Sequence, residues 1–82
     1  MEEPQQLTLH RPEALQAAID LMNGLQTGPF TSRPLIGATL DALDNGDVGT
    51  ALGYIDGASL YTITGKQEVK VAAALIRQAF NL

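Results

Sequence analysis

The most regular pattern in the chain is TGKQEVKVAAALIRQAF, residues 64–80. Its first four residues match the capping box, in which a threonine caps the helix start and a glutamine three residues later reaches back. Apolar residues then recur every three or four positions, as on one face of a helix. We predict a helix over residues 65–80 that is either central in the domain or part of a subunit interface. Its apolar face consists of Val69, Ala72, Ala73, Ile76 and Phe80, and Val71 and Leu75 widen it.

Two earlier segments contain residues that typically begin and end short helices. Pro12 suits the first turn of a helix, where its missing N–H is not needed, and Gly24 is a typical stop residue. Pro34 and Gly46 bracket the next segment in the same way. We predict helices over residues 12–23 and 33–45, with apolar stripes made of Leu15, Ala18, Ile19 and Met22 and of Ile36, Leu40 and Leu43.

The segment that follows is best interpreted as a third short helix, over residues 47–56. Asp47 is a favourable N-cap residue, and Gly57 is a stop signal. Residues 58–63 would then be extended and lie across the bundle. The helical period is carried by Val48, Ala51, Leu52 and Ile55.

A β-hairpin is the alternative for this segment. Its strands would be residues 50–55 and 58–64, joined by a two-residue turn at Asp56 and Gly57. Gly49 and Gly53 weaken both interpretations, since glycine disfavours helix and strand alike. Within a helix, their four-residue spacing suggests close backbone packing inside the bundle.

The predicted fold class is therefore all-α, a small bundle of three to four short helices, with the hairpin-containing α+β fold as the alternative. Residues 1–10 are mostly polar and are expected to form a flexible arm, while residues 11–82 form one small domain.

The first residues lack a basic flank and an apolar run, so we expect no signal peptide. No stretch approaches 18 uninterrupted apolar residues, so we expect a cytoplasmic protein without a membrane span.

Charge is unevenly distributed along the 82 residues, whose net charge is −4. Residues 34–65 contain four aspartates and no basic residue, whereas residues 66–82 contain three basic residues and one glutamate. Nucleic-acid binding requires a basic face that displaces counterions from phosphates, and this chain lacks one. We therefore expect neither a nucleic-acid nor a membrane partner.

The inventory of reactive side chains is too small for an enzyme. The chain has no cysteine and a single histidine, His10, which we expect at the surface or in a capping position. We predict no catalytic residue, no metal site and no cofactor. One weaker signal is an anion site at the start of the last helix, because helix N-termini attract anions. Its candidate contacts are Arg33, Thr64, Lys66 and Arg77.

These observations favour a non-enzymatic, self-associating protein-binding module, an adaptor or inhibitor of bacterial or phage origin. We expect a homo-oligomer, most simply a dimer, in which Lys70 and Arg77 meet Asp41 or Asp44 of the neighbour. The alternative is an oligomeric protein that binds and sequesters a small ligand or nucleotide at the anion site. The candidate interface residues are Phe30, Val71, Leu75 and Phe80.

Overall fold

The computed structural model describes residues 8–27, 33–62 and 64–82, and these residues form helices and no strand. The result confirms the predicted all-α bundle. The β-hairpin alternative is wrong, because a single helix, Val48–Tyr61, covers the whole first proposed strand and residues 58–61 of the second. No helix among the described residues has the length and apolar character needed to cross a membrane. The helices are α1 (Pro12–Gln26), α2 (Arg33–Asp44), α3 (Val48–Tyr61) and α4 (Lys66–Ala79).

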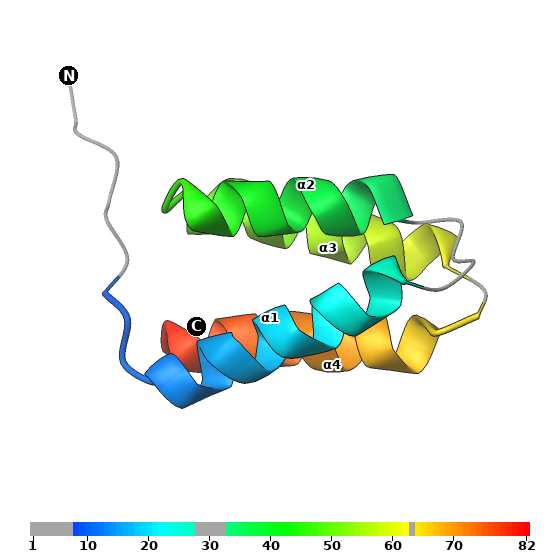
Figure 1. The fold of residues 1–82 in the computed structure, drawn as a ribbon. Coiled ribbons are helices and arrows are strands. Elements are labelled where there is room, and N and C mark those ends of the chain that lie inside the picture. The colour runs from blue at the N-terminus through cyan, green and yellow to red at the C-terminus, as the bar shows by residue number, and fades with distance from the viewer. Residues whose placement is uncertain (1–7, 28–32, 63) are drawn as a thin grey trace, which may run out of the picture.

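The helices form two antiparallel pairs (Figure 1), α1 with α4 and α2 with α3. Contacts of α3 with α4 and of α1 with α2 join the pairs, so each helix has two neighbours around a shared core. The segment before α1 is tied to the end of α4. The backbone N–H groups of His10 and Arg11 donate to the carbonyl oxygen of Ala79, at 2.8 and 3.0 Å. Residues 1–7 of the predicted arm lie outside the described residues.

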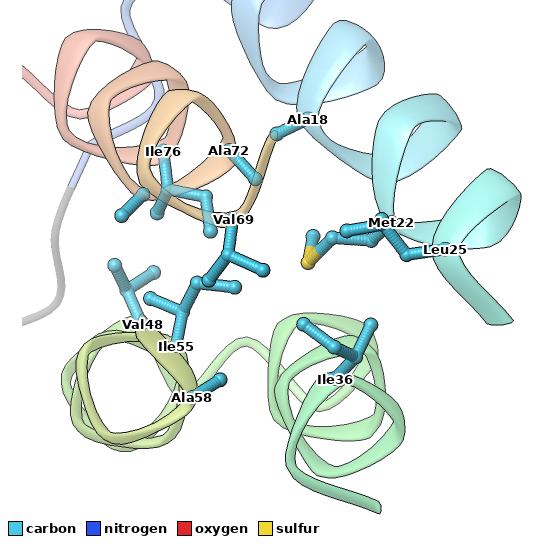
Figure 2. Close-up of a cluster of buried hydrophobic side chains, with 11 residues drawn as sticks. Ala18, Met22, Leu25, Ile36, Val48, Ile55, Ala58, Val69, Ala72 and Ile76 are labelled. Atoms are coloured by element: carbon cyan, nitrogen blue, oxygen red, sulfur yellow. The ribbon is translucent and has the colours of Figure 1, made fainter. Parts of the chain in front are cut away.

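Each helix contributes a fully buried side chain to the core (Figure 2), and the largest are Met22, Ile36, Ile55 and Ile76. Alanines fill much of the remaining core and let the helices approach closely. Burial of apolar surface is the main force that stabilises a fold. The helices therefore form a bundle because this arrangement buries the apolar stripes predicted from the sequence. The core is completed by Ala18, Leu25, Val48, Ala58, Val69, Ala72 and Ala73.

Two predicted helix ends are wrong for the same physical reason. Helix α1 continues through Gly24 to Gln26, which buries Leu25 in the core. Helix α3 continues through Gly57 to Tyr61, which buries Ala58, so most of the predicted extended segment 58–63 is helical. A glycine inside a helix costs about 1 kcal/mol. Burial of a leucine side chain contributes about 1.5–3 kcal/mol, so at Gly24 the packing of Leu25 outweighs the local stop signal.

One predicted helix cap is confirmed and one is wrong. The Asp47 carboxylate caps α3 by accepting hydrogen bonds from the Thr50 backbone N–H at 3.2 Å and the Thr50 hydroxyl at 2.7 Å. The capping box that begins at Thr64 does not form, because Gly65 is the N-cap of α4 and no side chain caps it. Gly65 has a left-handed backbone, with φ of 85°, a conformation that glycine adopts easily. Thr64 therefore lies one residue outside the cap.

Candidate functional site

The four candidate anion contacts are not brought together. Arg33 and Lys66 are the first residues of α2 and α4, and these two helix starts lie at the same end of the bundle (Figure 1). Thr64 is exposed just before α4. Arg77 lies in the last turn of α4, eleven residues beyond Lys66, a distance of about 16 Å along the helix. The structure thus separates Arg77 from the other three residues along the bundle.

Arg77 has an acidic partner within its own chain. Its two terminal nitrogens donate to the two carboxylate oxygens of Asp56 in α3, at 3.1 and 2.6 Å. These hydrogen bonds raise the pKa of Arg77, and the attraction of the opposite charge adds to them, while partial desolvation works in the other direction. Arg77 therefore serves to join α4 to α3 and to neutralise Asp56.

The candidate interface residues differ widely in exposure. Val71 is 41% exposed on α4, whereas Leu75 and Phe80 are partly buried and pack against the core cluster. Phe30 lies outside the described residues. The exposed side of α4 around Val71 also carries the charged residues Glu68 and Lys70. Val71 is thus an apolar side chain in charged surroundings.

A larger apolar surface lies on the outward side of α3. Leu60 and Tyr61 are 75% and 72% exposed, the two highest values among the large hydrophobic residues described. Figure 2 shows Val48 and Ile55 directed from α3 into the core, so the opposite side of the helix faces solvent. Tyr54, one residue before Ile55, is also exposed and stands two turns before Tyr61. These side chains lie on the same outward side of α3.

The outward side of α3 contains no charged residue. Successive residues of a helix are rotated by about 100° around its axis, so the seven residues that form this outward side fall within an arc of roughly 140°. The only charged residue in α3 is Asp56, which lies at the edge of this arc and is paired with Arg77. The exposed sides of α1, α2 and α4 all carry charged residues, among them Glu13, Asp41 and Lys66. We call the following set the α3 face: Gly49, Thr50, Gly53, Tyr54, Gly57, Leu60 and Tyr61.

Three glycines of the α3 face have no packing role within the chain. A Cβ atom added to Gly49, Gly53 or Gly57 would have no neighbour within 4 Å outside the adjacent backbone of the helix, so alanine would fit at each position. The sequence interpretation of close backbone packing inside the bundle is therefore wrong. Each glycine still lowers helix stability by about 1 kcal/mol relative to alanine. The glycines leave the middle of the face without side chains, between Tyr54 on one side and Leu60 on the other.

A shallow hollow of about 300 Å³ lies beside the α3 face, between α2 and α3. Asp41 and Asp47 line it together with Thr50 and Tyr54 of the face. The hydrogen bonds from the Thr50 hydroxyl and the Thr50 N–H hold the pKa of Asp47 below its usual value of 3.8. The Asp47 carboxylate is thus engaged as a helix cap, and this border of the α3 face is negatively charged.

Comparison of the chain with protein-family models, with curated proteins and with solved structures found no match. The functional interpretation therefore rests on the α3 face. Sequence reasoning missed Leu60 and Tyr61 because it placed them in an extended segment after Gly57. The signal was present in the seven-residue spacing of Tyr54 and Tyr61, which places both tyrosines on one side once the helix continues.

Proposed function

We infer that this chain is a non-enzymatic protein-binding module and that the α3 face is its contact surface. The observation that carries the proposal is the exposure of Leu60 and Tyr61 on a helix face without charge. Exposed apolar patches on small proteins commonly mark interaction sites, and tyrosine is enriched at protein interfaces. We further propose, as the sequence suggests, that the module is a cytoplasmic adaptor or inhibitor of bacterial or phage origin.

The shape of the α3 face suits another helix. A residue without a side chain lets a second backbone approach closely, and a four-residue glycine repeat places such gaps along one line of the helix. Tyr54 and Leu60 stand on opposite sides of that line and would flank an inserted helix. We therefore expect the partner to present a helix with small or apolar residues.

The alternative function, sequestration of a nucleotide at an anion site, has less support. Arg33 and Lys66 share one end of the bundle, but Arg77 lies further along α4 and is already paired with Asp56. Two exposed basic residues at separate helix starts form a weaker anion site than the four contacts expected from the sequence.

Site-specific photocross-linking tests the proposed contact surface. A photoreactive phenylalanine derivative would replace Tyr61 on the α3 face or, as a matched control, Ala17 on the exposed side of α1. Cells of the native host would then be irradiated. We expect protein cross-links from position 61 that disappear when Gly53→Leu fills the middle of the face. Equal cross-linking from positions 61 and 17, or cross-links that survive Gly53→Leu, would contradict the proposal.

A further inference from the structure

The α3 face has an acidic border on the side of α2. Asp41 of α2 and the cap residue Asp47 line the same hollow as Thr50 and Tyr54 of the face. Both carboxylates are on exposed residues, and neither forms an ion pair with a basic residue among those the structure describes. The negative potential of this border is therefore available to a partner.

The border on the side of α4 is basic. Arg77 marks this border, because its guanidinium binds Asp56 at the edge of the α3 face. Lys70 and Lys66 lie seven and eleven residues before Arg77, so helical geometry places all three within an arc of roughly 40° on α4. Both lysines are exposed. The uncharged α3 face thus runs between an acidic border and a basic border.

This arrangement of charge is complementary to itself in one orientation. A two-fold axis parallel to α3 places the acidic border of one copy against the basic border of the other. If the two α3 helices are antiparallel, the two-fold axis is perpendicular to the plane that contains them. The acidic borders of the two copies then lie against each other, and so do the basic borders. Like charges brought together oppose association, whereas opposite charges guide it and fix the orientation.

We propose that the partner on the α3 face is a second copy of this chain, packed with the two α3 helices parallel about a two-fold axis. This inference rests on the proposed function and names the partner of the same surface. The glycines of the two copies face each other in this arrangement, so the backbones approach closely, and the acidic border of each copy lies on the same side as the basic border of the other. One helix face is smaller than the ~800 Å² per partner of a standard interface, so the dimer is weak and salt-sensitive.

Two glycine variants separate loss of the dimer from loss of the fold. Gly53 on the α3 face and Gly24 in α1 are both exposed helical glycines, with no atom within 4 Å of an added Cβ. Replacement of either exposed glycine by leucine favours the helix, so we expect both variants to fold. The molecular mass would be measured by light scattering over a wide concentration range at low and high salt. We expect the original chain and Gly24→Leu to approach two chains at high concentration, and Gly53→Leu to remain one chain.

Thiol cross-linking tests the orientation. The chain contains no cysteine, so one introduced cysteine is unique. In a parallel pair, residue 60 lies near residue 60 of the other copy, so Leu60→Cys alone joins two chains through a short bis-maleimide. In an antiparallel pair centred on Ile55, residue 60 lies beside residues 49 and 50, so only a mixture of Leu60→Cys and Gly49→Cys would react.

Each result supports or overturns a distinct part of the inference. A mass of one chain for the original protein at every concentration, or a dimer that survives Gly53→Leu, would overturn the second copy as the partner. Cross-linking only in the mixture would overturn the parallel arrangement. If the chain is monomeric but Gly53→Leu still removes cross-links to a different protein, the proposed function stands and the inference about the partner fails.

Discussion

Arg77 in the last turn of α4 binds Asp56 of α3 through two hydrogen bonds, and the shorter one is 2.6 Å long. The two side chains are 40% and 50% exposed, so solvent screens their attraction. Asp56 is the only charged residue of α3 and lies at the edge of the α3 face, and its pairing with Arg77 neutralises its charge. Its importance therefore lies in the charge of the surface more than in the stability of the fold.

A double-mutant cycle measures the contribution of this pair to stability. Arg77→Met and Asp56→Asn, alone and together, would be unfolded in urea at low protein concentration. We expect a coupling energy of about 0.2–1 kcal/mol that decreases with added salt, because exposed ion pairs are weak. A coupling of several kcal/mol would mean that the pair behaves as a buried one.

Two substitutions in α3 distinguish its core side from its outward side. Ile55→Ala removes a fully buried side chain and should lower the free energy of unfolding by about 2–5 kcal/mol. Leu60→Ala, five residues later on the exposed side, should change it by less than about 0.5 kcal/mol. Urea denaturation at low protein concentration gives both values. Comparable losses for the two variants would contradict the orientation of α3.

The outward glycines should be replaceable with a gain in monomer stability. Gly53→Ala should raise the free energy of unfolding by up to about 1 kcal/mol, because it favours the helix and its methyl group meets no other atom. Gly46→Ala is the contrasting variant. Gly46 has a left-handed backbone, with φ of 76°, so alanine there should lower the thermal midpoint. A loss of stability in Gly53→Ala would show that the glycine has a packing role within the chain.

The cap of α3 predicts a specific dependence of stability on pH. The pKa of Asp47 is lower in the folded chain than its ordinary value of 3.8, so the unfolded chain takes up this proton first as the pH falls. The stabilisation by the Asp47 carboxylate is therefore complete above pH 3.8 and is lost as the pH falls through the lowered pKa. The thermal midpoint would be followed by circular dichroism for the original chain and for Asp47→Asn.

Asparagine is the matched control because it caps helices about as well as aspartate and does not titrate. The original chain should lose thermal stability relative to Asp47→Asn once the pH falls below 3.8. A difference between the two midpoints that stays constant from neutral to acidic pH would contradict the account of this cap.

The fold was largely predictable, because local signals and apolar periodicity agree over most of the chain. The pattern over residues 33–45, the cap at Asp47 and the apolar stripe with Ile76 all predicted elements that the structure contains. The errors occurred at Gly24 and Gly57, where a local stop signal competes with burial of the following residue. Local sequence patterns alone do not show how much surface the next residue buries.

The candidate surface was less predictable than the fold. Sequence periodicity marks which side chains are apolar, but only the packing of helices decides which of them stay exposed. Val71 and Leu75 looked equivalent on the apolar face of the last helix, yet Leu75 packs against the core and Val71 does not. Leu60 and Tyr61 are exposed because α3 continues past Gly57 while its neighbours cover only its other side.

Dilution followed by two-dimensional ¹H–¹⁵N spectroscopy most directly tests the central claim that copies of this chain meet through the α3 face. Spectra would be recorded over a hundredfold dilution from millimolar concentration. We predict that the amide signals of Gly49, Gly53, Gly57 and Tyr61 shift with concentration, while those of Gly24 in α1 and Val71 in α4 stay fixed. Shifts centred on Val71 with the α3 signals unchanged, or no shift at any position, would contradict the claim.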